Sequence, residues 1–314
     1  MNEKFTFIDL CSGIGGTRLG MEMAGGRCVY SCEKDVSATI TYKVNFNEDS
    51  LGDLTKVVVK DISKYEVLVA GFPCQAFSIA GKKLGFEDIR GTVFFDLVRI
   101  IKDTKPKAFL LENVKGLISH NKGWTLQVIQ DVLTDLDYDL NTVLLSPHTH
   151  CNIPQNRERV FIIGHKKEEF VFFPSKVPLR VKWKSLIDNE KQEDRFYYRN
   201  TESPSYNRIA EKVKNRDIIY QYRRYYVREN KTGVCPTLTA NMGLGGHNVP
   251  LIVDDWGIRK LTPRECARFQ GFPDSFILPK IGRGSGDSYL YKQIGNSVCV
   301  PLIKRIAQEM ITII

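Results

Sequence analysis

The 314-residue sequence lacks the usual marks of a membrane, secreted or zinc-binding protein. No apolar run approaches the roughly 20 residues that a membrane helix needs. The opening MNEKFTFIDL has no apolar stretch typical of a signal peptide, so we expect a cytoplasmic protein without membrane contact. The eight cysteines are scattered, and none forms a CxxC pair. This pattern argues against a disulfide framework and predicts no metal site.

Acidic residues are also in the minority. The chain has 36 Asp and Glu against 45 Lys and Arg, a net charge of +9 and a pI near 9.0. Such an excess favours a polyanionic partner, although a solvated basic face would show the same composition. Residues 166–230 alone contain 16 Lys and Arg against 10 Asp and Glu. We interpret this basic stretch as part of a second, smaller domain.

The first 165 residues alternate strand-like and helix-like patterns. The predicted strands are 5–10, 27–32, 57–59, 67–70, 108–111, 143–145 and 160–163. The predicted helices are 17–24, 94–102 and 125–136, and near the end a turn at 293–297 precedes a closing helix at 298–314. This alternation predicts an α/β fold with a mostly parallel sheet covered on both faces. Ligands of such sheets bind at the carboxyl ends of the strands.

The first motif is the glycine-rich turn that follows strand 5–10, DLCSGIGG at 9–16. Its glycines would allow a ligand to approach the backbone, and Glu33 after the second strand could bond a ribose hydroxyl. Asp61 lies at a third predicted strand end. The alternatives are a turn that only allows tight packing and, for Asp61, a helix N-cap. Because the spacing is not GxGxxG, a dinucleotide is not favoured.

Three further motifs carry reactive side chains. Cys74 directly follows a proline at the mouth of the predicted sheet, where a thiolate would be a strong nucleophile, although a structural cysteine is the commoner case. Glu112 follows a strand and could transfer protons, or could cap a helix. Arg157 and Arg159 alternate as the chain enters a strand, and they could bind oxygen acceptors or form a surface ion-pair ladder.

In this order, the motifs resemble those of the bacterial C5-specific cytosine DNA methyltransferases of restriction–modification systems. The resemblance continues through 259–268, 270–273 and 293–298 and covers essentially the whole chain. It implies a class I, S-adenosylmethionine-dependent methyltransferase fold with a Rossmann-like sheet. The implied catalytic domain is 1–175 with 288–314. The implied small domain is 176–287, and its target-recognition region spans about 182–256.

The resemblance implies S-adenosyl-L-methionine as cofactor and S-adenosyl-L-homocysteine as product. The implied cofactor-binding residues are Asp9, Gly13, Ile14, Gly15, Gly16, Glu33, Asp61, Ile62, Pro73, Val93, Asn296, Ser297 and Val298.

The resemblance also assigns the catalytic residues. Cys74 would add to C6 of cytosine and make C5 nucleophilic, and Glu112 would contact N3 and the N4 amine. Arg159 would hold O2, and Arg157 would support the site or a phosphate. Because a stacked base is out of reach, the target cytosine of double-stranded DNA would be flipped out.

The remaining implied roles concern DNA. Residues 77–92, which are rich in glycine and basic side chains, would form a lid over the flipped base. The implied DNA-binding residues are Gln75, Ser78, Lys82, Arg90, Gln221, Arg223, Arg224, Thr237 and Asn241. We expect a CCGG- or CCNGG-like site, a monomer at the bacterial nucleoid, and a cognate restriction endonuclease that acts separately.

Three other functions would account for parts of this sequence. A tRNA cytosine-5 methyltransferase would share this core, but that branch has two prolines before the cysteine, where this chain has Gly-Phe-Pro-Cys. A catalytically inactive DNA-binding regulator would not need Cys74, Glu112 and Arg159 together. An NAD-dependent oxidoreductase would need GxGxxG and would leave the later motifs unexplained.

Overall fold

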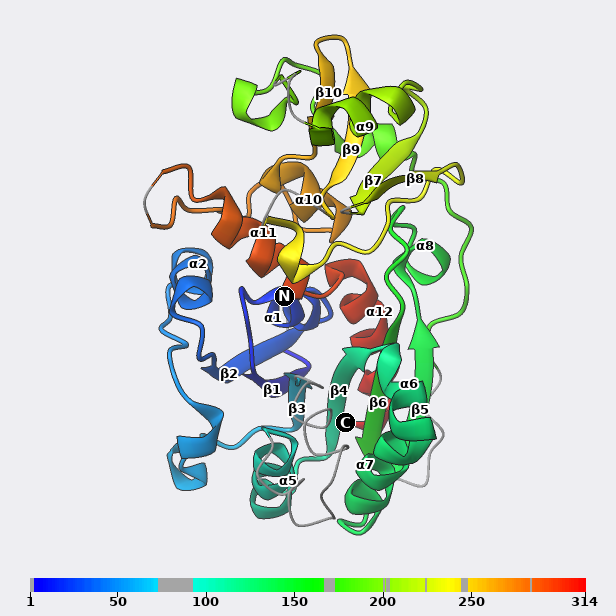
Figure 1. Cartoon of the computed structure of the whole chain (residues 1–314). Helices are drawn as coiled ribbons and strands as arrows, with labels where there is room; N and C mark the ends of the chain where they lie inside the picture. The colour runs from blue at the N-terminus through cyan, green and yellow to red at the C-terminus, as the bar shows by residue number, and fades with distance from the viewer. Residues whose placement is uncertain are drawn as a thin grey trace. The chain divides into compact units, whose positions relative to one another are not determined.

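The computed structural model describes residues 3–72, 93–166, 173–199, 201, 204–223, 225–243, 248–282 and 284–314 (Figure 1). They form two compact units. The first contains Met1–Leu145, Glu158–Ser175 and Val300–Ile314, and the second contains Ser146–Arg157 and Lys176–Cys299. This division groups 146–157 and 288–299 with the second unit, whereas the sequence-based division groups them with the catalytic domain. No helix among the described residues is long and apolar enough to span a membrane.

The first unit is built on a mixed sheet that is mainly parallel. Its strands are β1 (Phe5–Leu10), β2 (Gly26–Cys32), β3 (Val67–Gly71), β4 (Ala108–Val114), β5 (Asp139–Leu145) and β6 (Arg159–His165). Their order is β2-β1-β3-β4-β6-β5, with β6 antiparallel to both β4 and β5. The carboxyl ends of β1–β4 therefore lie along one edge, which confirms the predicted α/β fold.

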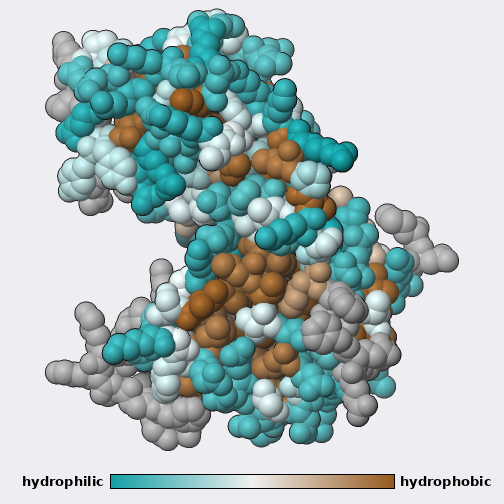
Figure 2. Space-filling model, turned by 90° about the vertical axis from the view of Figure 1, so that its right-hand side faces the viewer, coloured by the Kyte–Doolittle hydropathy of each residue, from teal (hydrophilic) through white to brown (hydrophobic). Residues whose placement is uncertain are grey.

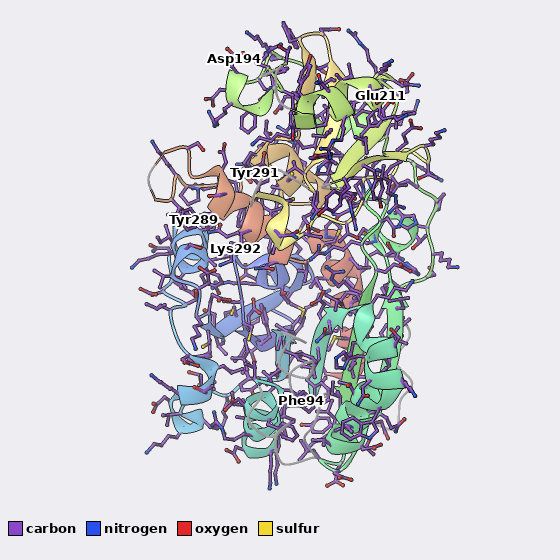
Figure 3. All side chains as sticks on the ribbon, in the orientation of Figure 1. Phe94, Asp194, Glu211, Tyr289, Tyr291 and Lys292 are labelled. Carbon is purple, nitrogen blue, oxygen red and sulfur yellow. The ribbon has the colours of Figure 1, made fainter. Side chains whose placement is uncertain are left out.

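Helices cover this sheet. They are α1 (Gly16–Met23), α2 (Val36–Phe46), η1 (Leu54–Lys56), η2 (Val59–Asp61), α5 (Val93–Thr104), α6 (Gly116–Ser119), η3 (His120–Gly123), α7 (Trp124–Thr134), α12 (Val300–Met310) and η7 (Ile311–Ile313). On α5, Phe94, Leu97 and Ile101 recur on one face and are buried in the core, as helical periodicity requires; Figure 3 labels Phe94 on this helix. On α1, Gly20 allows close packing on α12, because a Cβ there would lie 2.6 Å from the Ile303 side chain.

The second unit has its own sheet and core. Its elements are α8 (Pro147–His150), η4 (Trp183–Leu186), η5 (Asp194–Phe196), α9 (Pro204–Lys212), β7 (Ile219–Arg223), β8 (Tyr226–Asn230), η6 (Ala240–Gly243), β9 (Pro250–Asp254), β10 (Gly257–Lys260), α10 (Pro263–Phe269) and α11 (Asp287–Asn296). The strands form an antiparallel sheet in the order β10-β9-β7-β8. Ile209, Tyr220 and Leu251 are at its core.

Two local predictions are wrong. Residues 57–59 do not form a strand, because the carbonyls of Leu54 and Val57 accept hydrogen bonds from the Arg99 guanidinium, and the chain forms the short turns η1 and η2. Residues 293–296 are not a turn but the end of α11, and Ser297 is its C-cap, before the separate helix α12. A turn is predicted there because glycine, here Gly295, disfavours a helix. In the folded chain this helix position requires glycine, because a Cβ would collide with the backbone of Thr239.

Candidate active site

The turn that follows β1 keeps two glycines in the left-handed backbone region. Gly13 has φ +55° and Gly15 has φ +85°, so an L side chain at either position would be strained. A Cβ at Gly15 would come within 2.2 Å of the Phe46 ring, whereas a Cβ at Gly13 would meet no described atom within 4 Å. Gly15 therefore allows close packing against α2, and Gly13 faces open space that a ligand can approach.

Glu33, directly after β2, is bonded to this turn. Its Oε2 accepts a hydrogen bond from the Gly13 N–H at 2.7 Å, and its Oε1 accepts one from the Asp35 N–H at 2.7 Å. The register of the parallel pair places Leu10 beside Cys32, so the ends of β1 and β2 meet here. The carboxylate is thus held at the strand edge where ligands of such sheets bind.

Asp9, near the end of β1, is a buried carboxyl with unused acceptors. Its side chain is 1% exposed, and neither oxygen, nor Oγ of the nearby Ser12, accepts a well-formed hydrogen bond from the described residues. Burial raises the pKa of Asp9 to about 8, despite the nearby N–H and guanidinium of Arg18. A cationic ligand group beside Asp9 would favour its charged form.

Other predicted cofactor residues are divided between the units. Asp61 is the exposed last residue of η2 and caps no helix among the described residues, while Ile62 and Val93 are partly buried against the core of the first unit. In the second unit, Asn296 ends α11 with its side chain exposed, and Val298 is buried.

Glu112 and Arg159 form an ion pair at the carboxyl end of β4. The distance from Arg159 Nε to Glu112 Oε1 is 3.0 Å, and the side chains are 14% and 16% exposed, so water screens the pair only partly. Arg159 is the first residue of β6 and lies opposite Val114 in the register. Strand β6 pairs with β4 as far as Val114, so β4 is longer than the predicted strand 108–111. Glu112 therefore lies two residues before the end of β4.

Asn113 ties the neighbouring chain segment to this pair. Its side-chain amide is buried and donates to the Phe72 carbonyl at 2.9 Å. Gly71 lies beside Glu112 in the register, and a Cβ there would lie 3.4 Å from Glu112 Oε2. Sequence reasoning did not single out Asn113, although it stands beside Glu112 in the third motif.

Several predicted residues lie outside the described part of the chain. They are Pro73, Cys74, Gln75, Ser78, Lys82 and Arg90, with the predicted lid at 77–92, and Arg224.

Arg157, in the second unit, is buried and 3% exposed. Its guanidinium donates to the carbonyls of Leu238, Gly295 and Ser297 at 2.7, 3.0 and 2.5 Å. A planar guanidinium suits such a set of acceptors, because its N–H groups diverge in fixed directions. Arg157 is therefore placed to position the backbone of two distant segments. Its alternation with Arg159 was the signal in the sequence, but these partners were not visible there.

The predicted recognition residues differ in accessibility. Gln221 is 2% exposed, its amide donates to the Asn248 carbonyl at 3.2 Å, and its Oε1 accepts from Arg223 at 3.2 Å. Arg223 itself is exposed at the end of β7, as is Asn241 in η6. Thr237 donates its hydroxyl proton to the Asn156 carbonyl at 2.6 Å. The second unit, in the upper part of Figure 2, presents a largely hydrophilic surface.

Comparisons with known proteins agree with these motifs. The family model "C-5 cytosine-specific DNA methylase" matches residues 5–312. The chain is 46% identical to Type II methyltransferase M.Bsp6I of Bacillus sp. (strain RFL6) over 308 residues, covering 96% of each chain. It is 41% identical to M.HpaII of Haemophilus parainfluenzae, covering 99% of this chain and 90% of the relative. A solved structure of a DNMT2 mutant from Spodoptera frugiperda matches with a TM-score of 0.75 and 21% identity, covering 97% and 99% of the two chains, and shows the fold alone.

Proposed function

The chain belongs to the C-5 cytosine-specific DNA methylase family, and from this premise we propose how its residues carry out the reaction. It is a DNA (cytosine-5-)-methyltransferase of the type II restriction–modification class. Membership in the family implies S-adenosylmethionine as methyl donor and duplex DNA as substrate. The alternatives, a tRNA methyltransferase or an inactive regulator, are not favoured, because the matched relatives are named type II methyltransferases.

We propose Cys74 as the nucleophile. Addition of its thiolate to C6 breaks the aromaticity of cytosine and makes C5 an enamine carbon. S-adenosylmethionine, when bound, supplies the electrophilic methyl group that C5 accepts. Loss of the C5 proton to solvent water, with return of the N3 proton to Glu112, then restores the ring and expels the Cys74 thiolate. This covalent route converts one difficult substitution into easier addition and elimination steps.

Glu112 and Arg159 are proposed to hold the base during this addition. Addition at C6 moves electron density toward N3, where a protonated Glu112 donates, while its other oxygen accepts from the N4 amine. Arg159 donates to O2. The 3.0 Å distance between the two side chains supports their placement at one base, because groups this close can contact neighbouring atoms on one edge of a pyrimidine. Arg157 supports the site through backbone carbonyls.

The cofactor assignment is supported by the residues around the β1 turn. Open space above Gly13, the unused acceptors of Asp9 and the fixed carboxylate of Glu33 fit a ligand with an ammonium group and ribose hydroxyls. We propose that Glu33 bonds the ribose and that Asp9 favours the positive end of the methionine part. Asp61 and Ile62 are proposed to contact the adenine, and Asn296, Ser297 and Val298 remain assigned to the cofactor by resemblance.

DNA recognition is proposed to rest on exposed residues of the second unit. Arg223 and Asn241 are accessible, and an arginine can read guanine edges in the major groove. Buried Gln221 is better suited to aiming Arg223 than to contacting a base itself, because both ends of its amide are bonded. Basic residues elsewhere supply sequence-independent attraction to phosphates, which weakens as salt rises.

Transfer of labelled methyl groups to duplex DNA and to tRNA tests the function. We expect incorporation into DNA only, and incorporation into tRNA only would refute the proposal. Bisulfite sequencing of DNA from an expressing host would identify the site.

Cys74→Ser should abolish transfer while S-adenosylhomocysteine still binds, and surviving transfer would exclude the covalent mechanism. Undiminished turnover of Glu112→Gln across the pH range would exclude its proton-donating role.

We also propose that the chain acts as a monomer at the bacterial nucleoid, because its substrate is chromosomal DNA. A cognate endonuclease that cuts the same unmethylated site is proposed as a separate protein. Digestion of host DNA by such an enzyme, blocked by prior expression of this chain, is the expected result.

A further inference from the structure

Arg157 links two segments of the second unit that are far apart in the sequence. Its guanidinium donates to the Leu238 carbonyl at 2.7 Å and also to the Gly295 and Ser297 carbonyls at 3.0 and 2.5 Å. Leu238 is adjacent to Thr237 and near Asn241, which are assigned to DNA. Ser297 is itself assigned to the cofactor. One buried cation therefore bonds the backbone of both assigned segments.

The same segments touch directly at Gly295. A Cβ at this position would lie 2.3 Å from the Thr239 carbonyl carbon and 2.4 Å from its oxygen, far inside van der Waals contact. Only glycine allows the last turn of α11 to approach the Thr239 backbone this closely. A shift of either segment along this contact must therefore displace the other.

Two buried glutamines form a second connection. The Gln155 amide donates to the Phe269 carbonyl at 2.6 Å, and its Oε1 accepts from the Leu238 N–H at 3.2 Å. Gln270 donates to the Ile294 carbonyl at 3.0 Å, and the two side chains are bonded to each other at 3.2 Å. A continuous path of buried hydrogen bonds therefore runs from Leu238 to the end of α11.

The middle of α11 is held by a further buried hydrogen bond. The Tyr291 hydroxyl donates to the Leu261 carbonyl at 2.5 Å, and Figure 3 labels Tyr291 on this helix. Tyr291 thus anchors α11 four residues before Gly295, so the last turn of the helix extends from a fixed point to the Thr239 contact.

We propose that Arg157 is a positioning residue that, with Gly295, couples DNA recognition to cofactor binding. The coupling rests on the proposed role of Asn241 toward DNA and on the assignment of Ser297 to the cofactor by resemblance. A duplex that orders residues 237–241 lowers the free-energy cost of ordering residues 295–297 around the cofactor. Each ligand therefore increases the affinity of the protein for the other. Linkage requires the two effects to be equal.

The test compares the dissociation constant of S-adenosylhomocysteine, by equilibrium dialysis, with and without a duplex carrying the methylated site. This product supports no turnover, so the readout is independent of activity. We expect duplex to tighten binding by roughly tenfold in the unaltered protein, within the usual range of coupling. In Arg157→Lys the factor should fall below about twofold, because a flexible ammonium replaces the planar fork.

Arg305→Lys is the matched control. Arg305 lies on α12 in the first unit and donates to the Ser175 carbonyl, so the same substitution there should leave the coupling factor unchanged. A purely structural role for Arg157 would reduce the folded fraction but leave the ratio of the two dissociation constants as it was. An unaltered ratio in Arg157→Lys would therefore overturn the inference.

A measurement on the unaltered protein covers the case in which Arg157→Lys does not fold. S-adenosylhomocysteine alone should slow amide hydrogen exchange at residues 238–243, and unchanged exchange there would contradict the coupling. Failure of the proposed function is recognised separately, because the unaltered protein would then methylate no duplex. Methylation with a coupling factor of one would refute only the inference.

Discussion

Replacing Asp9 by Asn should stabilise the protein increasingly as the pH rises. Burial raises the pKa of Asp9 from 3.8 to about 8 in the folded chain. Between pH 3.8 and about pH 8 the Asp9 carboxyl of the folded state keeps a proton that the unfolded chain has lost. The free energy of unfolding therefore falls with each pH unit in this range. The stability contributed by this carboxyl is full below pH 4 and is lost as the pH approaches 8.

The size of the effect follows from the shift. About four pH units, from 3.8 to about 8, correspond to an upper limit of roughly 5–6 kcal/mol at 1.36 kcal/mol per unit. Asn has nearly the same shape and no charge, so the variant lacks this dependence. Urea unfolding at several values between pH 5 and pH 8.5 measures the free energy of unfolding. The advantage of Asp9→Asn over the unaltered protein should grow by several kcal/mol across this range.

Asp53→Asn provides the control. Asp53 is partly exposed, and hydrogen bonds from Thr55 together with Lys34 lower its pKa, so its removal should give no such growth. Parallel pH curves for Asp9→Asn and the unaltered protein would refute the argument from burial. Although Asp9→Asn should stabilise the fold, it should weaken cofactor binding, because it removes a charged partner of the proposed ammonium contact. S-adenosylhomocysteine should bind to this variant roughly 10- to 100-fold more weakly.

Three other outcomes are expected. Arg259→Met should lower the free energy of unfolding by about 3–5 kcal/mol in denaturant titration, because it leaves fully buried Glu265 without its bidentate partner at 2.8 Å. Gly15→Ala should destabilise the fold far more than Gly13→Ala in thermal melts, because only the former places a Cβ against Phe46; Gly13→Ala should mainly weaken cofactor binding. Raising salt from 50 to 200 mM should weaken binding to non-specific duplex severalfold or more, and salt-independent binding would contradict an electrostatic origin.

Much of the first unit was predictable because its signals are local. Runs of apolar residues such as those of β1 and β3, each followed by a glycine-rich or polar segment, predict buried parallel strands with ligands at their ends. The order of the motifs placed Glu112 and Arg159 in one site, and they form an ion pair. Residues 57–59 failed this reasoning, since Arg99 from α5 bonds the Val57 carbonyl, which a strand would have used.

The sequence by itself determined the class of fold, the family and the residue types that carry the chemistry, because these depend on periodicity and on motifs of adjacent residues. Only the tertiary structure decided what Arg157, Gln221 and Gly295 do. Arg157 bonds carbonyls that are 81 to 140 residues away. Gln221 is buried by neighbouring strands, and Gly295 is required by the backbone of Thr239. Backbone carbonyls have the same chemistry at every residue, so no sequence pattern records which of them a buried side chain will meet.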